Sequence, residues 1–413
     1  MVMDSATSLD QRAKLQQLAT LLSGNSAIAA LTLLRNIFAA RMIGVEQFGI
    51  AAALAIVATG IEMATNLGLP QMLVRDARGA TPRFQASLHF VQLIRGALAA
   101  GMLYLLAPYI AAFFQMEEVA WAFRVLAFMP LANSLLHLDA FRFQRSGRFG
   151  PSIVIGLGPA LLALMLIWPL FETYGDFRVL LFASFVQCIG TVILSHLIAE
   201  QRFKLVVARR HWPDVWTFGG PMALNGLLLL FVFHGEKILV AHLSGPADLA
   251  VIAMGFTLTL TPALILGRSL QTYALPKLSQ TTDQTAFEIA ANRLMKLCLA
   301  VAILATSALC AFSPLVTVLL GSDFSALQGL FPLLAILHGL RIARSGPTIA
   351  ALAKGHSLNA VWGNLPRIAA LPLGYLWLSS SGGLTGLIWI ALAAEAAGLA
   401  LSYVRLRQTM RVL

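Results

Sequence analysis

The chain has 413 residues, of which 58% are hydrophobic and 11% charged, whereas soluble globular domains are about 45–50% apolar and about 25% charged. This composition excludes a soluble protein and predicts an all-α integral membrane protein. The 29 Lys and Arg against 18 Asp and Glu give a formal net charge of +11, so the location of the basic surplus is informative.

Long apolar windows, separated by charged or Gly/Pro-containing breaks, divide the chain into twelve predicted spans. About 20 apolar residues cross a bilayer as a helix, which satisfies its own backbone groups in lipid. The first six spans are 18–41, 48–69, 85–107, 119–140, 150–171 and 179–200, and the second six are 214–242, 248–275, 291–313, 326–353, 357–378 and 384–404. The short connections leave no room for a large catalytic domain, so an enzyme is not expected.

Basic residues gather in alternate connections, and by the positive-inside rule these connections face the cytoplasm. Both termini are therefore expected in the cytoplasm, with an even number of spans. Trp212 and Trp216 fall near the inner interface, as an aromatic belt requires. The basic residues of these connections and tails are Arg12, Lys14, Arg75, Arg78, Arg83, Arg142, Arg145, Arg148, Arg202, Lys204, Arg209, Arg210, Lys277, Lys354, Arg405, Arg407 and Arg411.

An internal repeat divides the chain into halves. A shift of 201 residues lays 40–52 over 241–253, with Gly44 on Gly245, and a shift of 208 lays Gly147 on Gly355. The alternative is coincidence, since glycine turns are common in helical membrane proteins. The predicted organisation is a cytoplasmic tail (1–17), two pseudo-symmetric six-helix lobes (18–208 and 209–404) and a basic cytoplasmic tail (405–413). Parallel halves of this kind place a transport path at their interface.

Ionisable side chains inside the predicted spans give the strongest functional signal. Each costs roughly 2.5–3.5 kcal/mol near the bilayer centre, so it normally faces a bundle interior or a water-filled cavity. Even complete pairing would leave several cations without an acid, which predicts a cationic, substrate-binding cavity. The basic residues are Arg35, Arg95, Arg124, Lys237, Arg268, Arg341, Arg344 and Arg367, and the acids are Glu62, Glu236 and Glu395, with Asp139 at a helix end.

Helical spacing places His89, Gln92 and Arg95 on one face of the third span, and Arg341 and Arg344 on one face of the tenth. Such polar stripes favour a lined cavity. A structural role is the alternative for each cation. Arg124 can snorkel to the outer interface or pair with Glu117 or Glu118, Lys237 can pair with Glu236, and Arg35, Arg268 or Arg367 can be held by Glu62 or Glu395.

Two carboxylates are candidates for ion coupling. Glu62 lies one helical turn from Asn66, a spacing that can present a carboxylate for protonation or sodium binding, and Glu395 is the acid of the last span. A counter-ion role beside an arginine is the alternative for both. No cofactor or metal site is expected, and a proton or sodium gradient is the candidate driving force.

The segment 35–49 (RNIFAARMIGVEQFG), followed by 66–75 (NLGLPQMLVR), resembles the opening of Wzx-type polysaccharide-biosynthesis flippases. That family belongs to the superfamily that also contains the MATE exporters and the lipid II flippases. The segment 275–279 (LPKLS) is similar to the family's proline-bearing end of the eighth span.

The resemblance implies export of an undecaprenyl-diphosphate-linked oligosaccharide to the outer leaflet of the bacterial inner membrane by alternating access, for surface polysaccharide or O-antigen assembly. The diphosphate would bind the cationic cavity, since guanidinium suits bidentate phosphate contacts, while the lipid tail stays among membrane lipids. Polysaccharide polymerase machinery is an expected partner, and nucleic acid is not.

Two alternatives stay open. A MATE-like cation-coupled exporter of drugs or metabolites would present carboxylates to its cavity. A membrane polymerase or glycosyltransferase acting on the same lipid carrier would need a sizeable outer loop or an acidic metal-binding motif, and the predicted connections are short.

Overall fold

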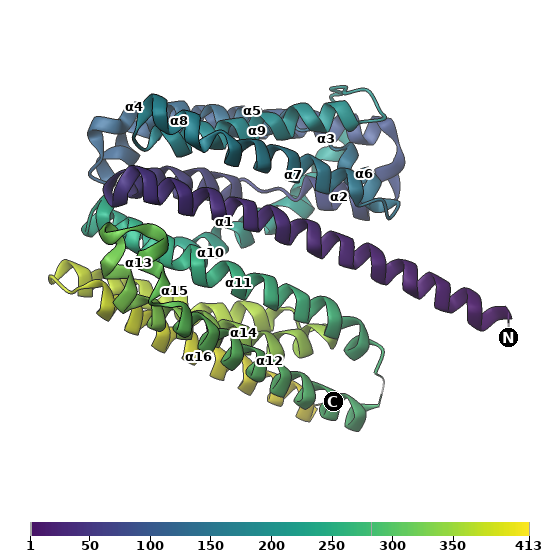
Figure 1. The fold of residues 1–413 in the computed structure, drawn as a ribbon. Helices are drawn as coiled ribbons and strands as arrows, with labels where there is room; N and C mark the ends of the chain where they lie inside the picture. Colours follow the sequence, from purple (N-terminus) through teal and green to yellow (C-terminus); the bar gives the residue numbers. More distant parts are fainter. Residues whose placement is uncertain (1, 282, 413) are drawn as a thin grey trace. The chain divides into compact units, whose positions relative to one another are not determined.

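The computed structural model describes the backbone of residues 2–281 and 283–412 and the side chains of 23–281, 283–408 and 410. The side chains of the predicted tail 1–17 lie outside this description. The described residues form helices and turns and no strand (Figure 1). The α-helices are α1 (Val2–Ala64), α2 (Leu69–Arg75), α3 (Pro82–Phe113), α4 (Ala120–Leu126), α5 (Phe128–Asn133), α6 (Asp139–Arg145), α7 (Gly150–Met165), α8 (Ile167–Tyr174), α9 (Arg178–Ile198), α10 (Trp212–Leu243), α11 (Pro246–Ser279), α12 (Gln284–Phe312), α13 (Leu315–Leu320), α14 (Ser325–Ala353), α15 (Leu358–Ser379) and α16 (Leu384–Val412).

The predicted all-α membrane architecture is confirmed by these helices. Within the described residues, eight helices are long and apolar enough to cross a membrane, or nine if α7 and α8, which meet at a bend of 41°, form one span. α1 contains the first predicted span and most of the second, and it is interrupted at Gly44, whose backbone is not helical. The total of twelve crossings stays a prediction.

Contacts divide the chain into a first unit (Met1–Ile43 and Ile50–Leu230) and a second unit (Gly44–Gly49 and Phe231–Leu413). This division by contacts falls within α10, and the predicted lobes 18–208 and 209–404 stay a prediction. The beginning of α10 belongs to the first unit because its backbone packs closely there. A Cβ atom added at Gly226 would collide with the Met63 carbonyl oxygen, and one at Gly219 would lie 2.9 Å from that of Leu67.

In the first unit, α3 packs against α4 and α5, and α9 packs against α7 and α8. A small core forms where α2, α3 and the start of α10 meet beside the N-terminal end of α6. It consists of Leu69, Met72, Leu73, Phe84, Leu88, Leu138 and Val215.

The predicted second and fourth spans, both in this unit, are broken. α1 ends at Ala64, and the chain leaves the helix before α2 begins at Leu69. Gly68 adopts a φ of 62° there, and its backbone N–H donates to the Asn66 side chain at 2.9 Å. The predicted span 119–140 is divided among α4, α5 and the start of α6. Broken helices leave backbone groups available inside a bundle, which is a common setting for binding sites in transporters.

In the second unit, α14 is the central helix. It packs against α11, α12 and α16, while α15 packs against α16, and these helices run side by side in Figure 1. The core around α14 includes Phe287, Cys298, Ile342, Ala350 and Leu406. Because α14 lies at this centre, its side chains are largely buried by protein. Arg341 and Arg344 are therefore buried within the second unit although the helix is mostly apolar.

The glycines matched by the internal repeat share backbone conformations. Gly44 has φ 81° and ψ 170°, and Gly245 has φ 88° and ψ −176°. Gly147 and Gly355 have φ values of 76° and 83°. These are conformations that L side chains rarely adopt, so the correspondence supports a repeat at both turns.

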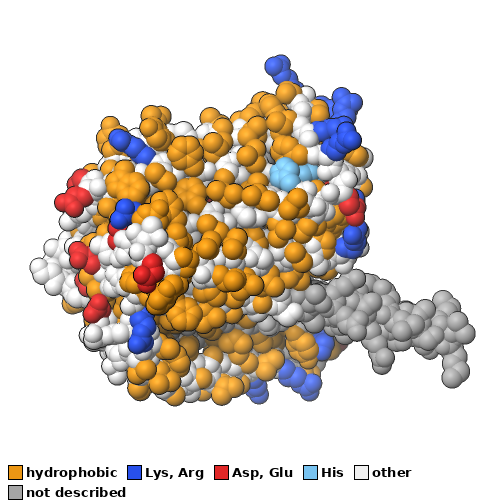
Figure 2. Space-filling model, turned by 45° about the horizontal axis from the view of Figure 1, so that its top comes forward, with side chains coloured by type: hydrophobic (Ala, Val, Ile, Leu, Met, Phe, Trp, Pro, Cys, Tyr) orange, Lys and Arg blue, Asp and Glu red, His pale blue; other side chains and the backbone are white. Residues whose placement is uncertain are grey.

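Apolar side chains cover most of the face drawn in Figure 2. Large exposed side chains include Leu98, Leu105, Trp216, Ile303 and Leu304. Apolar surface on this scale is expected where lipid, not water, contacts the helices. The chain is a multi-pass membrane protein.

Candidate functional site

The second unit contains a buried cluster of three arginines and two glutamates. Arg344 Nε donates to Glu395 Oε1 at 2.7 Å, Arg341 Nη2 lies 3.4 Å and Arg367 Nη1 3.3 Å from Glu395 Oε2. Arg367 also pairs with Glu236 of α10. The Glu395 side chain is fully buried. The cluster therefore links α10, α14, α15 and α16 through charge-assisted hydrogen bonds.

This cluster retains one positive charge in excess, since three guanidinium groups face two carboxylates. Arg341 has the most unused donors of the three, since its buried Nε and Nη1 atoms have no hydrogen-bond partner. Arg344, in contrast, also donates to Asn364 Oδ1 at 2.9 Å. Arg344 and Arg367 are thus largely committed to the protein itself.

Arg341 also lines a small pocket of about 180 Å³ between α11 and α14. Arg268 of α11 lines the same pocket and is exposed, and among the described residues it forms no ion pair. Gln271, Ser345 and Thr348 supply hydrogen-bonding groups beside the two arginines. Two guanidinium groups with neutral polar neighbours form an environment suited to an anion.

Lys237 is not paired with Glu236, which turns to Arg367 instead. Its ammonium lies 5.5 Å from the ring centre of Phe256, within the range of a cation–π interaction. His338, on the same face of α14 as the arginines, is buried and hydrogen-bonds the Thr259 hydroxyl at 2.8 Å. These two side chains stabilise the packing around the cluster.

The first unit holds a second polar site around Arg95 of α3. Its Nη1 donates to the Thr65 carbonyl oxygen at 3.3 Å, at the broken end of α1, and its buried Nε has no hydrogen-bond partner. The carbonyl end of a helix carries partial negative charge, which favours a cation there. Arg95 forms no ion pair within the described part of the chain. The Arg95 guanidinium is therefore partly buried and retains an N–H donor that no described protein group accepts.

Arg95 lines a polar pocket of about 290 Å³, together with Glu62, Asn66, Gln92 and Asn133. Glu62 accepts a hydrogen bond from Asn133 Nδ2 at 2.5 Å. Gln92 is held by the carbonyl oxygens of the break after α5. The pocket thus combines one cation, one carboxylate and three amides at the point where two predicted spans are broken.

The other predicted cations lie apart from these pockets. Arg35 of α1 is buried and donates from Nη1 to Gln187 Oε1 at 2.6 Å, while its Nε has no partner. Arg124 of α4 is exposed, and it forms no ion pair with Glu117 or Glu118 among the described contacts. Arg35 has a neutral amide partner rather than Glu62 or Glu395.

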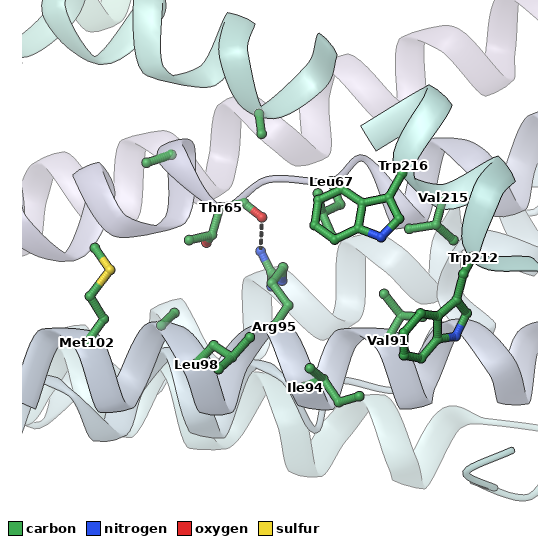
Figure 3. A pocket seen from close by; sticks show the side chains of 13 residues that line it. Thr65, Leu67, Val91, Ile94, Arg95, Leu98, Met102, Trp212, Val215 and Trp216 are labelled. Atoms are coloured by element: carbon green, nitrogen blue, oxygen red, sulfur yellow. Dashed lines mark hydrogen bonds between the residues drawn. The ribbon is translucent and has the colours of Figure 1, made fainter. Parts of the chain in front are cut away.

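Sequence reasoning missed Asn133 and Gln187, because neutral amides cost less in lipid than charges and give a weaker signal. It also did not connect Trp212 and Trp216 with Arg95. These three side chains line one apolar groove of the first unit (Figure 3). The spacing of the two tryptophans, one helical turn apart, was the available signal.

Outside the spans, an ion-pair group closes the connection after α2. Arg78 Nη2 lies 2.7 Å from Asp76 and 2.8 Å from Asp214, and Arg145 donates to the Asp76 carbonyl oxygen. The hydrogen bond from Arg78 lowers the pKa of Asp76 to about 2. These contacts fix a basic connection, whose location in the cytoplasm stays a prediction.

Comparison with known families finds a match over residues 38–328 to a family described as polysaccharide biosynthesis protein. No curated protein matches the chain significantly.

Solved structures share its fold. An inward-facing multidrug resistance MATE transporter of the MOP superfamily is 13% identical, with a TM-score of 0.73 over 92% of this chain and 95% of that one. The lipid II flippase MurJ in an inward closed conformation is 14% identical, with a TM-score of 0.75 over 95% and 87%. The Vibrio cholerae MATE transporter VcmN is 18% identical, with a TM-score of 0.63 over 98% and 99%. The predicted MATE-like fold is confirmed.

Proposed function

Because the chain belongs to the polysaccharide biosynthesis protein family, we propose that it is a flippase for an undecaprenyl-diphosphate-linked oligosaccharide. It moves this lipid from the cytoplasmic to the outer leaflet of the bacterial inner membrane by alternating access. The exported unit enters surface polysaccharide or O-antigen assembly, where polymerase machinery is the expected partner. The MATE-like fold is compatible with transport of many substrates, so the substrate class is inferred from the side chains.

The observation that carries the proposal is that Arg95 and Arg268 have no acidic partner at ion-pair distance among the described residues. Both lie on pocket walls inside membrane-spanning helices, and neither forms an ion pair among the described residues. Cations in such positions are costly unless an anion compensates them. A diphosphate supplies that anion and matches the guanidinium geometry.

The remaining arginines have a different role in this proposal. Arg344 and Arg367 hold α14 and α15 to Glu395 of α16. Their carboxylate partners leave one positive charge unbalanced, and Arg341 carries it into the pocket that Arg268 lines. In this proposal the buried cluster positions Arg341, and Arg341 is the member of the cluster that contacts the substrate.

Glu62 is the better of the two candidates for ion coupling. Glu395 is occupied by three guanidinium groups, whereas Glu62 lines the polar pocket with Arg95. An ionised Glu62 competes with a diphosphate for the charge of Arg95, and a protonated Glu62 releases it. A proton or sodium gradient acting through Glu62 and Asn66 would thereby couple to substrate affinity.

The position of Glu62 also favours one alternative, a cation-coupled exporter of drugs or metabolites, because a carboxylate on a pocket wall can bind a cationic substrate. The two functions separate in cells. Deletion of a drug exporter increases susceptibility to cationic compounds and leaves the lipid-linked pool unchanged. Deletion of the flippase leaves that susceptibility unchanged and causes the lipid-linked precursor to accumulate.

The experiment is deletion of the gene followed by measurement of surface polysaccharide and of the lipid-linked repeat unit. We expect loss of the polymer and intracellular accumulation of its lipid-linked precursor. Complementation should succeed with the wild-type chain and with Arg124→Gln, and fail with the combined Arg95→Gln and Arg268→Gln changes. An unchanged polymer and precursor pool in the deletion strain would contradict the proposal.

A further inference from the structure

An apolar groove in the first unit opens beside Arg95 (Figure 3). α3 forms one side with Val91, Ile94, Leu98 and Met102, and the start of α10 forms the other with Trp212, Val215 and Trp216. The end of α1 contributes Ala64, and the break after it contributes Thr65 and Leu67. The groove has a volume of about 320 Å³, and Arg95 is its one charged lining residue among those described.

The groove faces outward from the first unit's own core. Leu98 is 70% exposed and Trp216 is 64% exposed, although both are large apolar side chains. In a helix that crosses a membrane, such surface contacts lipid. The lining of α3 extends from Val91 to Met102, which corresponds to about 16 Å of helix. A hydrocarbon chain aligned with α3 would contact apolar groups along this length.

The tryptophans indicate the polar end of the groove. Trp212 and Trp216 lie one turn apart on the same face of α10, and both line the groove. Tryptophan is favoured at the membrane interface, where its ring is apolar and its N–H remains near polar groups. An amphiphile in the groove can therefore keep its chain along α3 while its polar head lies close to the interface.

Arg95 connects the groove to the polar pocket. Arg95, Thr65, Leu67 and Ala99 line both cavities, so the guanidinium stands at their shared wall. In Figure 3 it extends from α3 toward the Thr65 carbonyl oxygen, between the α3 side chains and Trp216. One side of this wall is apolar, and the other presents amide groups of Asn66, Gln92 and Asn133.

We infer that this groove holds the polyprenyl chain of the lipid-linked substrate next to its diphosphate, with the diphosphate on Arg95 and the first sugar directed into the polar pocket. This inference rests on the proposed function and assigns its lipid subsite to the first unit. Its basis is charge complementarity: a long hydrocarbon chain joined to an anion matches an apolar groove whose wall holds a cation with a buried, unpartnered Nε.

The test measures binding of undecaprenyl diphosphate without sugar to the full-length chain in phosphatidylcholine nanodiscs. Leu98→Trp fills the groove, and Leu105→Trp is the matched control, because Leu105 is 71% exposed on the same helix and does not line the groove. Leu98→Trp should weaken binding about tenfold, which corresponds to displacing about two methylene groups of the lipid from the groove. Leu105→Trp should leave binding unchanged.

Head-group recognition is tested with Arg95→Gln and Arg95→Lys. Loss of a charge-assisted hydrogen bond predicts that Arg95→Gln weakens binding by about tenfold or more, and Arg95→Lys should restore part of it. Inorganic diphosphate is the second probe: its binding should respond to Arg95→Gln and not to Leu98→Trp. Each variant must first match the wild type in its thermal unfolding midpoint.

Equal binding by Leu98→Trp and Leu105→Trp would overturn the inference, as would displacement of the probe by an equal amount of phosphatidylglycerol, which would identify an ordinary phospholipid site. Failure of the proposed function has a different signature, since it would leave the lipid-linked pool unchanged in the deletion strain. A Leu98→Trp chain with intact probe binding that restores export refutes the groove and leaves the flippase in place.

Discussion

Arg344 Nε donates to the fully buried carboxylate of Glu395 at 2.7 Å, across the interface of α14 and α16. Arg341 and Arg367 also lie within 4 Å of this carboxylate. The arginines inside the predicted spans therefore differ in their partners. Arg344 and Arg367 are held mainly by carboxylates of the second unit. Arg341 keeps two donors without a partner, and Arg95 and Arg268 form no ion pair among the described residues, so in the proposed function these three are the arginines available to an anion.

Removal of the Glu395 charge should unfold the second unit readily. Glu395→Gln leaves three buried guanidinium groups with Glu236 as their remaining carboxylate, and breaking a buried pair of this kind costs about 3–5 kcal/mol. We expect a large fall in the thermal unfolding midpoint in detergent. Glu172→Gln, at an exposed position of α8, is the control. A Glu395→Gln midpoint equal to that of the control would show that the cluster is dispensable.

Arg268→Gln should reduce export about tenfold or more without lowering stability. Arg268 is exposed and unpaired among the described residues, so its loss strands no buried partner. Loss of one charge-assisted contact to diphosphate is worth about 1.5–3 kcal/mol, and Arg268→Lys should retain part of the activity. The measurement is complementation of the deletion strain together with the unfolding midpoint. Full complementation by a stable Arg268→Gln chain would remove this residue from the site.

The repeat turns should depend on glycine. Gly245 has a φ of 88° and no atom within 4 Å of an added Cβ, so Gly245→Ala is penalised by backbone conformation alone. The expected cost is about 1–3 kcal/mol. Gly101→Ala also meets open space but lies inside helix α3, where alanine is favoured by roughly 0.5–1 kcal/mol. The two unfolding midpoints should therefore move in opposite directions, and a common direction would refute the conformational argument.

Acid should selectively weaken the connection after α2. The pKa of Asp76 is about 2 in the folded chain because Arg78 donates to its carboxylate, against 3.8 for the ordinary group. A depressed acid pKa stabilises the fold above the unfolded value, and the contribution is lost as the pH falls from about 4 toward 2. The difference in unfolding midpoint between wild type and Asp76→Asn should shrink over this range. A constant difference from pH 6 to pH 2 would contradict the assignment.

Much of the fold could be predicted because lipid imposes strong rules on sequence. Apolar windows located the helices, and the coincidence of Gly44 with Gly245 located two equivalent turns. The breaks were harder to find. The end of α1 depends on the Asn66 side chain bonding the Gly68 backbone, a local contact that hydropathy does not register.

The residue types of the candidate site could be predicted from the sequence, but the ion pairs that they form could not. Helical spacing placed Arg341 and Arg344 on one face, but it could not identify Glu395, which is 51 residues beyond Arg344, as the acid between them. Nor could it separate Arg268 from Arg367, since both are single arginines in apolar helices. Pairing depends on which helices pack together, which is a property of the tertiary structure.

The central claim is that the chain moves a lipid-linked oligosaccharide and that unpaired arginines bind its diphosphate. The most direct measurement is transfer of that lipid between leaflets in proteoliposomes containing the purified chain. We predict rapid transfer with the wild type and with Arg124→Gln, and transfer at the protein-free rate with the combined Arg95→Gln and Arg268→Gln changes. Transfer at the wild-type rate by this double variant, or no transfer by the folded wild type, would contradict the account.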